Sequence, residues 1–171
     1  MNTPTLDAEA IYAALRESIR RAIAEQPGRT PHLIGIHSGG AWIARRLHQE
    51  LSLSTPLGLL SSAFHRDDYG QRVGRGLPSG LRASELPMSV DGARIILVDD
   101  ILFTGRTVRA ALNELFDYGR PAQVELAVLI DRGGRELPVE ARYCGVRAPL
   151  SPPRNYVLAQ DAQGLFSLRI E

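Results

Sequence analysis

Two adjacent acids follow a strongly apolar run of the chain, and a Thr-Gly-Arg-Thr sequence comes shortly after them. The run is Ala93 to Val98, the acids are Asp99 and Asp100, and the second sequence is Thr104 to Thr107. Carboxylates at the end of a strand can accept hydrogen bonds from the vicinal hydroxyls of a ribose. A glycine-containing helix start holds phosphate through its backbone N–H groups. Together these residues predict a sugar-phosphate site.

Either half of this pattern has a simpler interpretation. An acidic pair after a strand is often a solvated turn, and Thr-Gly before a helix is often a cap. The complete order, with apolar residues between the acids and Thr104, is more specific than either half. The residues predicted to bind the sugar phosphate are Asp99, Asp100, Ile101, Leu102, Phe103, Thr104, Gly105, Arg106 and Thr107.

Buried strands and amphipathic helices alternate along the chain, which predicts the elements that position these residues. The alternation favours an α/β fold with a doubly wound, mostly parallel sheet, in which ligands bind outside the carboxyl ends of the strands. We expect one domain over residues 1–171, with a Gly- and Pro-rich flap at about 65–90. The expected strands are His32–Ile36, Leu57–Phe64, Ala93–Val98 and Val124–Ile130, with short strand-like runs at Tyr156–Leu158 and Phe166–Ile170; the expected helices are Leu6–Glu25, Ala41–Leu51 and one through Val108 and Leu115.

The composition is that of an ordinary globular protein. Apolar residues make up 44% and charged residues 23% of the 171 positions, and the formal net charge is +1. This balance gives no support to a protein that is basic all over and holds nucleic acid by charge alone. No apolar run approaches the ~20 residues that span a bilayer. Cys144 is the single cysteine, which excludes an internal disulfide. We expect a cytoplasmic protein without a membrane segment.

Four segments carry a resemblance to a known family. They are GIHSGGAWIARRL (Gly35–Leu47), HRDD (His65–Asp68), VDDILFTGRTVRAALNEL (Val98–Leu115) and LAVLIDRGGRELP (Leu126–Pro138). The chain resembles the type I phosphoribosyltransferases, and among them the bifunctional pyrimidine operon regulatory proteins that are also uracil phosphoribosyltransferases. RGGRELP is more specific to that group than Thr104–Thr107, called the phosphate loop after its predicted role.

The resemblance implies an activity and a cofactor. The implied reaction joins uracil to phosphoribosyl pyrophosphate, giving UMP and pyrophosphate. Mg²⁺ would be bound through the pyrophosphate, with Asp99 and Asp100 as candidate ligands, and these two acids would also be the catalytic residues. Similar proteins form dimers or larger homo-oligomers.

The resemblance also implies further substrate contacts. The loop Ser38-Gly39-Gly40 would bind pyrophosphate, Arg66 would contact it from the flap, and Asp131 and Arg132 would lie near the nucleobase. The family commonly has Thr-Arg-Gly where this chain has Ser38-Gly39-Gly40. The missing arginine is expected to weaken pyrophosphate binding unless His37 and Arg45 compensate.

Alternatives remain open at this point. The protein could be mainly an RNA-binding attenuator of the pyrimidine operon, with UMP as effector and Arg16, Arg20 and Arg21 as phosphate contacts. Those arginines equally fit an ordinary solvated helix face. A phosphoribosyltransferase for another nucleobase is a further alternative. Arg135 and Glu136 could form a structural ion pair instead of binding a ligand.

Overall fold

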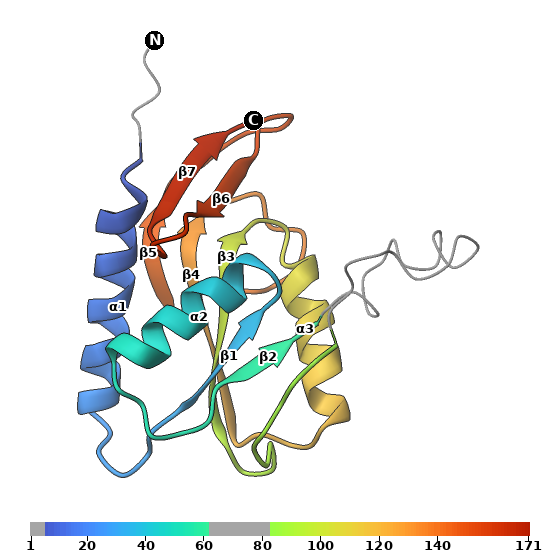
Figure 1. Ribbon diagram of the computed structural model, residues 1–171. Helices are drawn as coiled ribbons and strands as arrows, with labels where there is room; N and C mark the ends of the chain where they lie inside the picture. Colours follow the sequence, from blue (N-terminus) through green and yellow to red (C-terminus); the bar gives the residue numbers. More distant parts are fainter. Residues whose placement is uncertain (1–5, 62–82) are drawn as a thin grey trace.

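The core of the protein is a five-stranded parallel sheet, seen in a computed structural model that describes residues 6–61 and 83–171 (Figure 1). The strand order is β2-β1-β3-β4-β5. Neighbouring strands all run parallel. The strands are β1 (His32–Ile36), β2 (Gly58–Leu60), β3 (Arg94–Leu102), β4 (Gln123–Asp131) and β5 (Tyr143–Arg147).

Helices cover both faces of this sheet, which makes the fold doubly wound as predicted. Two helices, α1 (Ala8–Ala24) and α2 (Gly39–Glu50), pack with one face of β1, β3 and β4 in a single apolar cluster. The third helix, α3 (Arg106–Asp117), packs with the opposite face in a second cluster (Figure 1). The central strands are therefore apolar on both faces, as expected for buried parallel strands.

The central strand β3 is longer than its apolar run suggested. The sequence predicted an end at Val98, but the ladder with β4 continues through Asp99 opposite Val128 and Leu102 opposite Asp131. The prediction of this boundary was wrong because the acidic pair interrupts the apolar run, whereas pairing with a long neighbour keeps the backbone extended. Both acids therefore belong to a strand, not to a loop.

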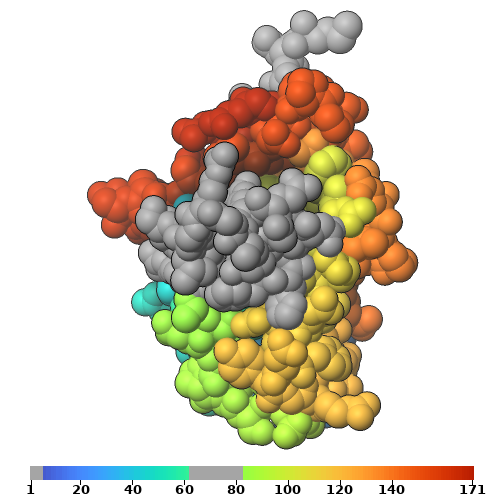
Figure 2. Space-filling view, turned by 90° about the vertical axis from the view of Figure 1, so that its right-hand side faces the viewer, coloured from blue at the N-terminus to red at the C-terminus, as the bar shows by residue number. Residues whose placement is uncertain are grey.

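Three elements of the second half complete the fold. Strand β5 was not predicted, since its sequence YCGVR has no continuous apolar run. The last two elements, β6 (Tyr156–Gln160) and β7 (Phe166–Ile170), form an antiparallel hairpin that is separate from the main sheet. In the space-filling view the orange and red C-terminal segments cap one end of the molecule (Figure 2).

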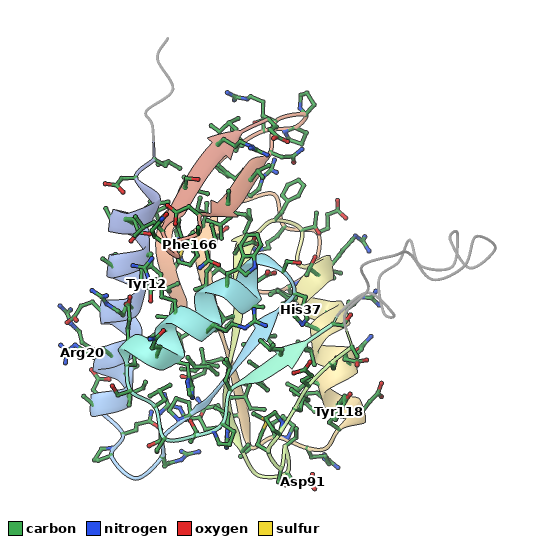
Figure 3. All side chains as sticks on the ribbon, viewed as in Figure 1. Tyr12, Arg20, His37, Asp91, Tyr118 and Phe166 are labelled. Carbon is green, nitrogen blue, oxygen red and sulfur yellow. The ribbon has the colours of Figure 1, made fainter. Side chains whose placement is uncertain are left out.

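An arginine on α2 fixes this hairpin to the helices. Both terminal nitrogens of Arg46 donate to the carboxylate of Glu9, at 2.7 and 2.8 Å, and Glu9 also accepts from the backbone N–H of Phe166. The Arg46 guanidinium lies 4.2 Å from the centre of the Tyr12 ring and 5.1 Å from that of Phe166. Figure 3 shows Tyr12 and Phe166 next to each other at this junction.

The predicted flap at 65–90 lies mostly outside the described residues. Its last part returns along β2, where Glu85 and Leu59 exchange backbone hydrogen bonds. Ser84 accepts from the backbone of Ser61 and donates to Glu114 of α3. Within the described residues, every helix is too short or too polar to cross a membrane.

Candidate functional site

The strand order places the candidate site between β1 and β3. From β1 the chain turns outward to β2, and from β3 it turns the other way to β4, so the connections diverge and leave a crevice at the carboxyl ends. The loop after β1 contains His37 and Ser38, which are joined by a cis peptide bond. The loop after β3 contains Phe103, Thr104 and Gly105. His37 is labelled in Figure 3 near this end of the sheet.

The first of these loops runs directly into α2, which begins at Gly39 and not at the predicted Ala41. A β-carbon at Gly39 would overlap the carboxylate of Asp100, and one at Gly40 would overlap the carbonyl oxygen of Val98. Glycine is needed at both positions because the helix start lies directly on β3. A side chain at position 39 would have to displace the Asp100 side chain, so the departure from the family's Thr-Arg-Gly pattern agrees with the packing.

The paired acids differ in exposure. Asp99 is buried, with 6% of its surface exposed, whereas Asp100 is half-buried. Asp99 Oδ1 accepts from the backbone N–H of Asp100 at 2.9 Å, and Asp100 Oδ1 accepts from the N–H of Ile101 at 2.8 Å. Each carboxylate is thus held through one of its two oxygens, which fixes the orientation of the side chain near the end of β3.

The second loop leads into the helix start at which the sequence predicts phosphate binding. Gly105 is the residue before α3 and has a φ of +92°, which favours glycine. It has no side chain that could cap the first N–H groups of the helix. Thr104 Oγ1 accepts from the N–H of Arg106 at 3.2 Å. Gly105 itself gives the helix no side-chain cap, and a helix start of this kind is suited to an anionic ligand.

The RGGRELP segment, whose role the sequence left open, lies against this second loop. The backbone N–H groups of Glu136 and Leu137 both donate to the carbonyl oxygen of Thr104, at 2.9 and 3.0 Å. The Glu136 carboxylate accepts from Arg106 Nε at 2.8 Å. Arg135 donates to the carbonyl oxygen of Phe103 at 2.7 Å. The segment therefore lies between β4 and the phosphate loop and holds the loop by hydrogen bonds.

Ion pairs in this segment differ from the suggested pairing of Arg135 with Glu136. Arg135 pairs with Asp131 at 2.5 Å, and Glu136 pairs with Arg106. Burial acts to raise the pKa of Asp131, but hydrogen bonds from Arg135 and from the Gly133 N–H outweigh it. They hold the pKa below its usual 3.8. Asp131 is therefore a paired carboxylate at neutral pH.

Arg132, predicted to lie near the nucleobase, makes its contacts with the C-terminal segment. One terminal nitrogen donates to Asn155 Oδ1, and the other donates to the carbonyl oxygens of Leu150 and Arg154, all at 2.8 to 2.9 Å. The guanidinium lies 4.0 Å from the centre of the Phe103 ring. No sequence signal pointed to these partners, because they follow β5, which was not predicted.

The structure thus brings most of the predicted site residues to one edge of the sheet. Gly39 lies against the side chain of Asp100 and Gly40 against the backbone of Val98 and Asp99, and Ser38 directly precedes them. The phosphate loop follows β3, Asp131 ends the neighbouring strand β4, and Arg132 comes directly after it. Arg66 lies outside the described residues.

Comparison with known proteins agrees with this arrangement. The family model described as "Phosphoribosyl transferase domain" matches residues 4–152. The chain belongs to the phosphoribosyl transferase family. This phosphoribosyltransferase is 48% identical to the "Bifunctional protein PyrR" of Ralstonia nicotianae over 96% of this chain and 92% of the relative. It is also 48% identical to the protein of that name from Nitrosococcus oceani, over 99% and 97% of the two chains. The resemblance inferred from the sequence is confirmed.

Solved structures agree on the fold of this phosphoribosyltransferase. A hypoxanthine-guanine phosphoribosyltransferase from Bacillus anthracis matches with a TM-score of 0.65 and 18% identity, covering 90% of this chain and 87% of the other. A hypoxanthine phosphoribosyltransferase from Staphylococcus aureus matches with a TM-score of 0.64 and 22% identity, covering 86% and 78%. At these identities the similarity establishes the fold and not the base that is used.

Proposed function

We propose that this phosphoribosyltransferase transfers ribose 5-phosphate from phosphoribosyl pyrophosphate to uracil, releasing UMP and pyrophosphate. The observation that carries the proposal is the contact between the Gly39 backbone and the Asp100 carboxylate. It joins the predicted pyrophosphate loop to the predicted ribose site, with the phosphate loop a few residues farther along the same chain segment. The pyrophosphate, the ribose and the 5′-phosphate of phosphoribosyl pyrophosphate would thus bind at adjacent sites. The choice of uracil is supported by the similarity to the PyrR proteins.

The reaction breaks the bond between ribose C1 and the pyrophosphate oxygen, forms a bond from C1 to a ring nitrogen of uracil and releases the proton of that nitrogen. A sugar cation that develops at C1 is stabilised by fixed negative charge, and a held geometry lowers the barrier further. In the proposal, Asp99 and Asp100 accept hydrogen bonds from the ribose hydroxyls and supply that charge. Thr104 to Thr107 hold the 5′-phosphate at the start of α3. Ser38 to Gly40 contact the departing pyrophosphate through their backbone.

Mg²⁺ is the cofactor of this proposal. Carboxylate oxygens at Asp99 and Asp100 are donors of the kind that this hard cation prefers. No group of three or more acidic, histidine or cysteine side chains within residues 6–61 and 83–171 could hold a metal by itself. This donor set fits an ion that takes one or two protein carboxylates and its other ligands from substrate phosphates. When bound, the ion would neutralise charge on the leaving pyrophosphate.

The nucleobase would lie near the end of β4. The side chains of Asp131 and Arg132 have protein partners, as do the backbone N–H groups of Arg132 and Gly133, so the backbone of Gly134 is the candidate contact for the base. A competition assay tests the base preference: the protein is incubated with phosphoribosyl pyrophosphate, Mg²⁺ and equal amounts of uracil, hypoxanthine and guanine. The proposal predicts UMP as the main nucleotide, and a purine nucleotide as the main product would contradict it.

Regulation of pyrimidine genes is a second proposed activity, favoured by the word "bifunctional" in the names of the relatives. The helix arginines suggested as RNA contacts already pair with carboxylates: Arg16 with Glu50, and Arg20 and Arg21 with Glu17. These ion pairs are at least partly exposed and therefore weak, so a phosphate of a leader RNA could still compete for the three arginines. A gel shift with the protein's own operon leader at low salt tests this activity, and absence of binding would contradict it.

Cytoplasmic location and homo-oligomer formation also belong to the proposal. Both come from the sequence interpretation and from the resemblance to the family. Sedimentation velocity on the purified protein tests the second: a dimer or a larger species is expected, and a monomer at micromolar concentration would contradict it.

A further inference from the structure

We propose that Arg132 and Arg135 are positioning residues that hold the phosphate loop through Phe103. The inference rests on the proposed role of Thr104 to Thr107 in binding a 5′-phosphate. Phe103 is the residue directly before Thr104, so its position determines where the loop begins. The two arginines act on different parts of this residue, one on its carbonyl oxygen and the other on its ring.

Arg135 fixes the backbone of Phe103. Its Nη1 donates to the Phe103 carbonyl oxygen at 2.7 Å, its Nη2 pairs with Asp131 at the end of β4, and its Nε donates to the carbonyl oxygen of Val139 at 2.9 Å. One planar guanidinium thus joins the phosphate loop, β4 and the segment that follows it. A lysine could not make these three contacts in three directions, because its charge lies at a single nitrogen.

Arg132 fixes the ring of Phe103. Its guanidinium lies 4.0 Å from the ring centre, and a β-carbon at Gly134 would overlap an edge atom of the same ring. The phenyl group is therefore confined by a cation and by a backbone that carries no side chain. A cation in contact with an aromatic ring attracts it, and more strongly when both are shielded from water.

Arg132 also contacts the segment that precedes the C-terminal hairpin. The residue is buried, with 4% of its surface exposed, and its terminal nitrogens hold Leu150, Arg154 and Asn155. These residues lead into the β6–β7 hairpin. Arg132 therefore links the C-terminal segment to the phosphate loop, and both of its terminal nitrogens donate to protein atoms, whereas its buried Nε has no hydrogen-bond partner among the described residues. This arrangement suits a positioning residue better than one that touches substrate.

The test measures binding of ribose 5-phosphate by titration calorimetry, together with melting temperatures. The variants are Arg135→Lys, Arg132→Lys and Phe103→Leu. Each should weaken ribose 5-phosphate binding by about tenfold, because a small displacement of a binding loop is costly. The control is Tyr143→Phe, which removes the hydrogen bond from Tyr143 to Glu125 where β5 begins, at the other end of the sheet. It should lower the melting temperature and leave the dissociation constant within about twofold of wild type.

The results distinguish a role in positioning the phosphate loop from a role in stability alone. Wild-type affinity in Arg135→Lys and Phe103→Leu would overturn the inference, and these two variants suffice if Arg132→Lys does not fold. A loss of binding in Tyr143→Phe as large as in the arginine variants would also overturn it, because the effect would then follow stability alone. Wild-type protein that binds no ribose 5-phosphate would instead overturn the proposed phosphate site, and with it this inference.

Discussion

The backbone of Gly39 lies against the carboxylate of Asp100, so closely that a β-carbon at position 39 would overlap that side chain. Gly39 begins α2, and Asp100 lies near the end of β3. The contact joins the start of α2 to the end of β3, and the loops that follow β1 and β3 lead away from each other along the sheet. In the proposed reaction these loops hold the leaving pyrophosphate and the ribose, so their spacing determines whether both ends of one substrate can bind together.

Replacement of this glycine should therefore impair catalysis more than stability. Gly39→Ala is expected to lower kcat/KM for UMP formation by about 100-fold, because the added methyl displaces Asp100 or the loop by a fraction of an ångström or more. Steady-state kinetics and a melting curve on the same preparation measure the two effects.

The matched control for this variant is Gly58→Ala in β2. A β-carbon there would meet the side-chain ends of Leu86 and Ile34 at 2.9 and 3.0 Å, outside the proposed site. Its kcat/KM should remain within about threefold of wild type, since distant substitutions act independently. Equal losses of activity in the two variants would mean that the Gly39 contact has no special role.

Stability depends on a buried charge network at the opposite end of the sheet. Arg94 Nε pairs with Glu125 at 2.9 Å, both side chains are only 3% exposed, and Tyr143 donates to the same carboxylate. Arg94→Met should lower the free energy of unfolding by about 3 kcal/mol, because it leaves a buried carboxylate without its main partner. Urea denaturation measures this loss.

An exposed ion pair provides the comparison. Arg169 and Glu171 pair at 2.7 Å, but their side chains are 66% and 57% exposed. Arg169→Met should change the free energy of unfolding by less than about 1 kcal/mol, as is usual for exposed pairs. Similar losses in the two arginine variants would contradict the importance assigned to burial.

The anchor of the C-terminal hairpin should make stability depend on pH. The hydrogen bonds from Arg46 hold the pKa of Glu9 below its usual 4.5. A carboxyl whose pKa is lower in the folded state stabilises the protein above its unfolded pKa and loses this contribution as the pH falls through the folded value. The melting-temperature difference between wild type and Glu9→Gln should thus be full above pH 4.5 and shrink below it. A difference that stays constant from pH 7 to pH 3 would contradict this.

Much of this architecture could be predicted from apolar patterning. Strand β1 matches its predicted bounds, and α1 differs from them by two residues at the start and one at the end. The paired acids and the phosphate loop could be found because their residue types and spacing occur in one short segment. The placement of Ser38 to Gly40 opposite the acids also follows, since the carboxyl ends of neighbouring parallel strands meet.

Features that depend on distant partners could not be predicted in this way. The extension of β3 through Asp99 requires the β4 ladder, and β5 forms at the sheet edge without an apolar run. Arg132 was predicted to lie near the nucleobase because of the resemblance to the family. Its observed partners lie 18 to 23 residues farther along the chain, a separation at which no local pattern is informative.

The most direct measurement for the whole account is formation of UMP by wild-type protein and by the double variant Asp99→Asn with Asp100→Asn. Wild type, supplied with uracil, phosphoribosyl pyrophosphate and Mg²⁺, should produce UMP and pyrophosphate in equal amounts. The double variant should fold and lose about 100-fold or more in kcat/KM, because it neutralises the two carboxylates that the proposal places beside the developing cation. An unchanged kcat/KM in the folded double variant would contradict the roles assigned to the two acids, and folded wild type that makes no UMP would contradict the proposed function.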